Sequence, residues 1–208
     1  RNWRFNLRAL VVGNRPLDSK VIELAKNSLV IAADAGADRL LKYNITPDVI
    51  IGDLDSVSDK TITRLEEWTI SNKNVQKTDL EKAVDHAFEK RAEEVIVIGW
   101  SGGRIDHTLA ALGIVFDSRV KLIDDKFTIH CVDESKTIEG PKNTIFSLIA
   151  MPEARISVEG ARWNLQHEKL RIGGRGIHNE IGASGKVTIE CHSGNLLLIE
   201  GDFLLPHD

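Results

Sequence analysis

Carboxylates, glycines and an arginine follow the apolar runs in the first half of this sequence. The run Asp48–Ile51 leads into Gly52, and Asp53 and Asp55 then stand one residue apart. If the extended backbone continues through them, both side chains point the same way. Carboxylates held together repel each other unless a cation lies between them, and Mg²⁺ commonly binds through carboxylates and substrate phosphates. The pair therefore predicts a metal site, with a helix cap at Asp55 or Ser56 as the alternative.

A glycine-rich turn, Ser101–Arg104, follows another apolar run and leads into a segment of helical period. Backbone N–H groups at a helix start attract anions, and an arginine binds phosphate oxygens through paired hydrogen bonds. The pattern predicts a phosphate site, although paired glycines before an arginine also mark tight turns. Asp106 would hold metal or orient Arg104. His107 either contacts the substrate or is a hydrogen-bonded histidine at the helix start.

Short apolar runs alternate with segments of helical period, which predicts a parallel sheet covered by helices. The predicted strands are Ala9–Val12, Leu29–Ala33, Asp48–Ile51, Val95–Ile98 and Val120–Ile123. Ligands of such sheets bind outside the carboxyl ends of the strands. The polar and glycine residues expected to meet at that edge are Asn14, Asp34, Gly36, Gly52, Asp53, Asp55, Ser56, Gly102, Gly103 and Arg104.

A further helix is predicted over residues 78–91, with Thr78 as its cap. Asp79 either shares that cap or faces the cleft. Lys82, like Glu81 and Asp85, fits a solvated helix face and needs no function.

From about residue 135 the sequence consists of short β-prone runs separated by Gly, Asn and Pro, without a long amphipathic segment. We therefore expect an α/β protein: an N-terminal doubly wound, mostly parallel sheet domain over 1–132, followed by a smaller all-β sandwich domain over 133–208. In the second domain, Trp163 offers a flat face for a heteroaromatic or cationic ring. A buried core position for Trp163 is equally compatible with the sequence.

Composition narrows the class of protein. The chain has 208 residues and a net charge of −4, which gives no basic field for nucleic acid or an anionic membrane. Its apolar runs are shorter than the roughly 20 residues that cross a bilayer. Isolated Cys131 and Cys191 indicate neither a disulfide framework nor a zinc site. We expect a cytoplasmic protein and, because the first residue is not Met, one that is trimmed or part of a longer product.

Taken together, these residues resemble the thiamine pyrophosphokinase (thiamine diphosphokinase) family. The matching pieces, which span nearly the whole chain, are ADAGADRLL, TPDVIIGDLDS, KTDLEKAV, GGRIDHTLA, GARWNL, GIHNE and SGNLLLIEGDF. The resemblance implies an N-terminal ATP-binding domain and a C-terminal domain for thiamine binding and dimerisation. It also implies a homodimer with thiamine sites between subunits, and transfer of diphosphate from ATP to the thiamine hydroxyl with release of AMP.

Family roles carried onto matching positions divide the site residues among four tasks. The predicted Mg²⁺ ligands are Asp34, Asp53, Asp55 and Asp79. The predicted catalytic residues are Asp53, Asp55, Asp79 and Arg104. The predicted ATP-binding residues are Asn14, Asp34, Gly36, Ser56, Gly102, Gly103, Arg104, Asp106 and His107. The predicted substrate-binding residues are Gln76, Thr78, Asp79, Trp163, His178 and Asn179.

Two positions depart from the family pattern. Gln76 stands where the family carries acidic residues, and His178 replaces the serine of a Gly-x-Ser-Asn turn. Both changes concern substrate identity more than nucleotide binding. Two alternatives therefore stay open: a diphosphokinase for another heterocyclic alcohol such as a hydroxymethylpterin, and a non-catalytic sensor of thiamine or nucleotide.

Overall fold

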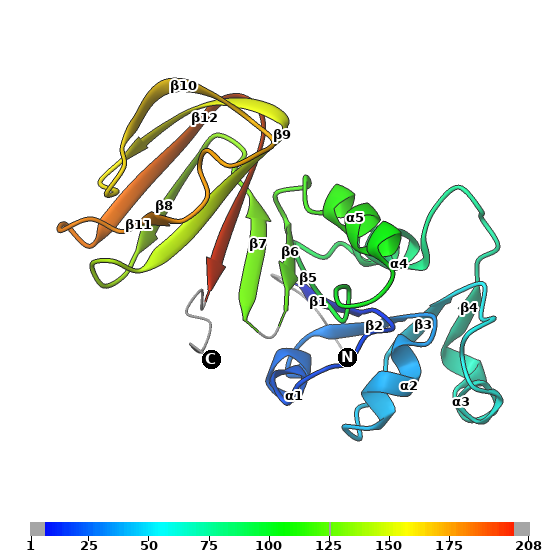
Figure 1. Ribbon diagram of the computed structural model, residues 1–208. Coiled ribbons are helices and arrows are strands. Elements are labelled where there is room, and N and C mark those ends of the chain that lie inside the picture. Colours follow the sequence, from blue (N-terminus) through cyan, green and yellow to red (C-terminus); the bar gives the residue numbers. More distant parts are fainter. Residues whose placement is uncertain (1–6, 125, 202–208) are drawn as a thin grey trace. The chain divides into compact units, whose positions relative to one another are not determined.

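A computed structural model describes residues 7–124 and 126–201 of the chain (Figure 1). The described residues form two compact units, one built from residues up to 115 together with 119–124, the other from 116–118 together with residues from 126 onward. The change of unit at 126 lies before the predicted boundary at 133. The reason is that β7 (Phe127–Cys131) pairs with β12 (Lys186–Gly201), a strand of the second unit.

The first unit contains a parallel sheet in the order β6-β5-β1-β2-β3-β4. Its strands are β1 (Arg8–Val12), β2 (Leu29–Ala33), β3 (Val49–Gly52), β4 (Thr69–Ser71), β5 (Glu94–Ile98) and β6 (Val120–Ile123). All five predicted strands are present. The prediction missed β4, a three-residue edge strand that is largely exposed and therefore shows no apolar run.

Helices cover both faces of this sheet. They are α1 (Lys20–Ala25), α2 (Gly36–Leu41), α3 (Asp59–Arg64), α4 (Asp79–Glu89) and α5 (Ile105–Ile114), with a 3₁₀ turn at Glu66–Trp68. Within this unit α1, α2 and α3 lie on one face, and α4 and α5 lie on the other (Figure 1). Because both faces are covered, the central strands are apolar throughout, and Leu10, Ile31 and Ile50 are fully buried.

The strand order reverses between β1 and β5, since the chain adds β2 to one side of β1 and later places β5 on the other. Loops that leave two such neighbouring strands diverge to opposite faces and open a crevice at the carboxyl edge. The residues that follow β1, β2, β3 and β5 therefore surround the place where a ligand of this unit is expected.

The second unit is antiparallel and β-rich, as predicted. Its strands are β7, β8 (Ser135–Glu139), β9 (Ile145–Glu159), β10 (Leu165–Arg171), β11 (Asn179–Glu180) and β12. β9 and β12 pair along most of their length, from Thr188↔Glu159 to Glu200↔Phe146, with register shifts after Cys191 and Gly194. β8 and β7 pair with the two ends of β12, while β10 and β11 pair with β9.

The core of the β unit consists of inward-facing side chains from these strands, with Phe146, Leu148, Ile156 and Leu196 almost completely buried. Among the helices in residues 7–124 and 126–201, none has the length and apolar character needed to span a membrane.

Candidate functional site

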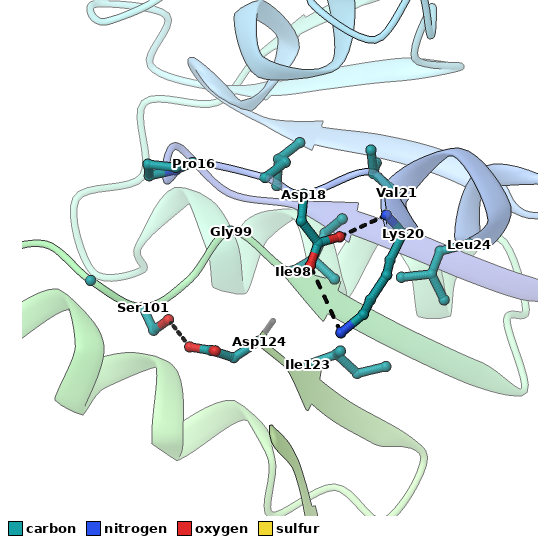
Figure 2. Close-up of a pocket in the computed structure, with 12 residues that line it drawn as sticks. Pro16, Asp18, Lys20, Val21, Leu24, Ile98, Gly99, Ser101, Ile123 and Asp124 are labelled. Atoms are coloured by element: carbon teal, nitrogen blue, oxygen red, sulfur yellow. Dashed lines mark hydrogen bonds and ion pairs between the residues drawn. The ribbon is translucent and has the colours of Figure 1, made fainter. Parts of the chain in front are cut away.

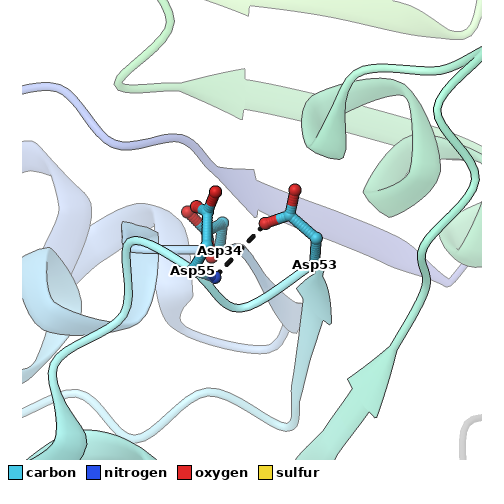
Figure 3. A group of neighbouring side chains, drawn as sticks. All are labelled: Asp34, Asp53 and Asp55. Atoms are coloured by element: carbon cyan, nitrogen blue, oxygen red, sulfur yellow. Dashed lines mark hydrogen bonds between the residues drawn. The ribbon is translucent and has the colours of Figure 1, made fainter.

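Three aspartates lie together at the carboxyl ends of β2 and β3 (Figure 3). One oxygen from each of Asp34, Asp53 and Asp55 lies within 4.8 Å of the others. Asp34 follows β2 while Asp53 and Asp55 follow β3, so the parallel pairing of these strands brings the carboxylates together. A hard divalent cation such as Mg²⁺ takes oxygen ligands of this kind.

The backbone between the paired aspartates differs from the extended geometry that the sequence predicted. β3 ends at Gly52, and Leu54 adopts a left-handed conformation with φ of 70°. The Asp55 backbone N–H donates to Oδ1 of Asp53 at 3.2 Å, which closes a tight turn. The two carboxylates therefore meet through a turn rather than by strand alternation. Leucine rarely takes this conformation, and strained backbone of this kind gathers at functional sites.

Asp34 is the buried member of the cluster, with 7% of its surface exposed. Its Oδ1 is buried and has no hydrogen-bond partner in the described part of the chain. Burial raises the pKa of this carboxyl group, and the negative charges of Asp79 and Asp55 raise it further. A divalent cation would satisfy the orphaned oxygen and offset the repulsion, so the donor set fits such an ion.

The three carboxylates open into a cavity of about 400 Å³ at the carboxyl edge of the sheet. Nine of the predicted site residues line it: Asn14, Asp34, Asp53, Asp55, Ser56, Thr78, Asp79, Arg104 and His107. Gly36, Gln76 and Asp106 are not in its wall. Gly36 is buried at the start of α2, where a side chain would collide with the carbonyl of Val12.

Asp79 is held in place by the start of α4. Thr78 caps this helix as predicted: its backbone N–H donates to Oε2 of Glu81 at 2.8 Å, and its hydroxyl accepts from the Glu81 N–H at 3.2 Å. Asp79 is the next residue; it lines the cavity and lies close to Gly52. A Cβ at Gly52 would lie 3.3 Å from Cγ of Asp79.

Lys82 contradicts the prediction of a solvated helix face. Its side chain is only 5% exposed, and its ammonium group donates to Oδ1 of Asp79 at 2.8 Å and to the Asn72 carbonyl at 2.9 Å. One turn of α4 separates Asp79 from Lys82, so the pair is local, but its burial comes from the tertiary structure. Lys82 therefore stabilises the carboxylate of Asp79 and holds the loop before α4.

Arg104 has a partner already. Its guanidinium is 71% exposed and binds the Asp106 carboxylate through contacts of 3.1 and 2.5 Å. The hydrogen bond from Arg104 lowers the pKa of Asp106 to about 2. Of the two roles predicted for Asp106, the structure favours the orientation of Arg104 over metal binding.

Arg15 was missed by sequence reasoning, although it also lines the cavity. Its guanidinium lies across Gly103: a Cβ built there would be 1.8 Å from Cζ of Arg15. The sequence signal for Arg15 was its place three residues after the first predicted strand, in the run Asn14-Arg15-Pro16.

A second cavity of about 360 Å³ lies beside the first, between the loop before α1 and the ends of β5 and β6 (Figure 2). Its apolar wall includes Leu24, Ile98 and Ile123. Its polar groups are already engaged, since Asp18 accepts from the Lys20 backbone N–H at 2.7 Å and Ser101 donates to Asp124 at 2.5 Å. Gly102 lines this cavity, and Gly99 lines both cavities, so a ligand that passes Gly99 would contact both.

The remaining predicted site residues belong to the β unit. Trp163 is 49% exposed, which excludes the buried core position, and the Arg162 guanidinium stacks on its ring at 4.5 Å. Asn179 is buried and fixes the neighbouring turn, because its side chain bonds both the backbone N–H and the carbonyl of Trp163, at 3.2 and 2.9 Å. His178 is exposed and left-handed, with φ of 59°.

Residues 22–125 match the family model for "Thiamin pyrophosphokinase, catalytic domain", and residues 126–196 match "Thiamin pyrophosphokinase, vitamin B1 binding domain". The second match begins at residue 126, where the chain also passes into the second structural unit.

Among individual sequences, thiamine pyrophosphokinase 2 of Oryza sativa subsp. japonica is 30% identical over 92% of this chain and 85% of its own length. Thiamine pyrophosphokinase 1 of the same organism is 26% identical over 70% of this chain and 69% of its own. The crystal structure of thiamine pyrophosphokinase from Bacillus subtilis superposes with a TM-score of 0.79 at 24% identity, covering 95% of this chain and all of that one. The last comparison supports the fold.

Proposed function

Because this chain belongs to the thiamine pyrophosphokinase family, a family of transferases, we propose that it transfers the diphosphate of ATP to the hydroxyl of thiamine, giving thiamine diphosphate and AMP. One observation carries the proposal for this chain: the buried, unpartnered oxygen of Asp34 lies beside two further carboxylates in a cavity that an arginine also lines. Such a cavity fits a cation together with a phosphate chain.

The chemical roles follow from the groups in the cavity wall. Asp34, Asp53 and Asp55 would hold Mg²⁺, which supplies positive charge to the phosphates when bound. Asp79, stabilised by Lys82, accepts a hydrogen bond from the attacking hydroxyl and orients it towards the phosphate chain. Arg104 contributes a positive charge at the cavity mouth. Positioning and electrostatics of this kind account for most of the catalysis of phosphoryl transfer.

The nucleoside part of ATP is assigned to the cavity of Figure 2. Its apolar wall suits a heteroaromatic base, and its shared residue Gly99 connects it to the carboxylate cavity. On this assignment Gly102 lies beside the phosphate chain that joins the two cavities, whereas Gly103 lines neither cavity and lies next to Arg15.

The β unit is assigned the thiamine ring and the dimer contact. The half-exposed Trp163 ring supports the first assignment, since it already stacks with the cationic Arg162 guanidinium and a cationic heterocycle would stack on tryptophan in the same way. The dimer contact receives support from Ile172 and Ile177 of the β unit, which are 63% and 52% exposed. Sedimentation equilibrium of the purified protein tests the dimer, because a monomer at micromolar concentration contradicts it.

Partly buried free thiols at Cys131 and Cys191 support a reducing compartment such as the cytoplasm, which cell fractionation would test.

The function itself is tested by AMP formation from ATP and Mg²⁺, with thiamine and a hydroxymethylpterin compared as acceptors. We expect AMP only with thiamine. When inorganic tripolyphosphate replaces ATP, orthophosphate leaves in place of AMP, and the formation of thiamine diphosphate should be much slower because the base cavity is then unused. AMP formation with the pterin alone would contradict the thiamine assignment. Binding of ATP and thiamine without AMP would indicate a sensor.

Asp34→Asn should raise the thermal stability of the protein at pH 7 without Mg²⁺ by roughly 2–4 °C. The pKa of Asp34 is raised in the folded state, so the folded protein binds this proton more tightly than the unfolded chain does. Stability therefore falls as the pH rises through that raised pKa, and asparagine removes the effect. Asparagine also tolerates the left-handed backbone here, where φ is 49°.

The same variant separates metal binding from simple repulsion. Mg²⁺ should raise the melting temperature of the parent protein and leave that of Asp34→Asn nearly unchanged. At a pH below the ordinary carboxyl range the two melting temperatures should converge. Equal stabilisation of both proteins by Mg²⁺ would place the ion elsewhere.

A further inference from the structure

We propose that Arg15 binds the phosphate chain of the nucleotide and that Gly103 creates the space that positions it. The inference depends on the proposed function only for the identity of the ligand as ATP. The anion-binding role follows from the geometry and the charges of the cavity wall.

The Arg15 guanidinium packs directly against Gly103. A Cβ on residue 103 would be 1.8 Å from Cζ and 2.2 Å from Nε and Nη1 of Arg15, distances that no pair of non-bonded atoms tolerates. The guanidinium therefore occupies the volume that any other side chain at 103 would need. This gives the second glycine of the turn a role other than direct approach of the backbone to a phosphate.

The backbone of Arg15 is fixed from both sides. Its N–H donates to the Gly99 carbonyl at 3.0 Å, and Pro16 restricts it to extended conformations. The preceding Asn14 accepts two hydrogen bonds from Arg39, at 3.3 and 3.2 Å. With the chain held in this way, the side chain is directed over Gly103 into the cavity wall.

The charges of the cavity wall indicate the kind of ligand that Arg15 would bind. The Arg15 guanidinium forms no hydrogen bond or ion pair with any residue in 7–124 or 126–201, although it is partly buried. By contrast, the positive charge of Arg104 is already matched by Asp106. Arg15 shares its cavity with the aspartate cluster and does not contact it. A cavity lined by both an arginine and a carboxylate cluster suits an occupant with both charges, such as a metal-bound phosphate chain.

Arg15→Gln should raise the KM for ATP roughly 10- to 100-fold, the range expected when a hydrogen bond to a charged group is lost. The KM for thiamine and the circular dichroism spectrum should stay unchanged. Arg64→Gln, an equivalent change at an exposed position of α3, serves as the matched control and should behave as the parent.

Gly103→Ala tests the positioning step, because a methyl group must displace the guanidinium. It should raise the KM for ATP in the parent and add little in the Arg15→Gln background, since the contact is then already lost. Full additivity of the two changes, or a parent-like Gly103→Ala, would overturn the positioning role.

Calorimetric titration with Mg²⁺ and inorganic tripolyphosphate keeps this inference separate from the proposed function. Weaker tripolyphosphate binding by Arg15→Gln supports the anion site even if the parent forms no AMP with thiamine. If the parent forms AMP while Arg15→Gln retains both its KM for ATP and its tripolyphosphate affinity, the role of Arg15 is wrong and the proposed function stands.

Discussion

Asp53→Asn and Asp55→Asn should each lower the rate of AMP formation by about 10²- to 10³-fold, the loss typical when one charge-stabilising group is removed from an active site. Folding should be unaffected, because asparagine keeps the local acceptor atoms. The Asp55 N–H bonds Oδ1 of Asp53 at 3.2 Å, and the Ser56 hydroxyl bonds Oδ1 of Asp55 at 2.8 Å. Each variant also removes one negative charge from a repelling cluster, so its melting temperature without Mg²⁺ should equal or exceed that of the parent.

Measurement of AMP release across a range of Mg²⁺ concentrations checks this prediction. A ligand role requires that the concentration of Mg²⁺ for half-maximal rate increases in both variants, in addition to any loss of maximal rate. Asp59→Asn, in the first turn of α3 and outside the cavity, is the matched control and should retain full activity. Full turnover by Asp53→Asn and Asp55→Asn at parental Mg²⁺ concentrations would show that these carboxylates hold no catalytic metal.

Most strands of the α/β unit can be predicted from the local sequence pattern, but the backbone conformation between Asp53 and Asp55 cannot. The apolar runs identified β1, β2, β3, β5 and β6, and parallel pairing then placed Asp34 beside Asp53 and Asp55. The expected alternation along a continued strand was wrong, since Leu54 turns left-handed between them. Leucine is an ordinary strand residue, so no propensity rule predicts a positive φ at this position.

Lys82 and Arg15 were not predicted because their roles depend on burial and on contacts made by distant segments. Lys82 has the spacing of a solvated helix residue, and only the packing of α4 against the sheet and the Asn72 loop buries it. Arg15 gains its position from Gly103, a residue of another loop. Trp163 was left between two interpretations for the same reason, since periodicity cannot report which side of a turn faces solvent.

Asp79→Asn should lower both the free energy of unfolding and the rate of AMP formation, because Asp79 is the partner of the buried Lys82 and also faces the cavity. The ammonium group of Lys82 would stay buried without a counter-charge, because the substituted amide and the Asn72 carbonyl offer it only neutral oxygens. Breaking a buried ion pair from one side leaves an uncompensated charge, and because Asp79 is 29% exposed we expect a loss of about 2–3 kcal/mol in the free energy of unfolding. AMP formation should fall by about 10²-fold with the loss of the group that orients the hydroxyl. Urea unfolding and the AMP assay measure the two quantities separately.

The double variant Asp79→Asn with Lys82→Met distinguishes the structural part of the pair from the chemical part. Methionine keeps the apolar stem of Lys82 and removes its charge, and replacement of both members of a buried pair is often nearly neutral for stability. Stability should therefore return towards the parental value, whereas AMP formation should remain low because no carboxylate faces the hydroxyl. If activity returned together with stability, Asp79 would act only as the structural partner of Lys82. If stability failed to return, the pair would not be the energetic unit that the 2.8 Å contact indicates.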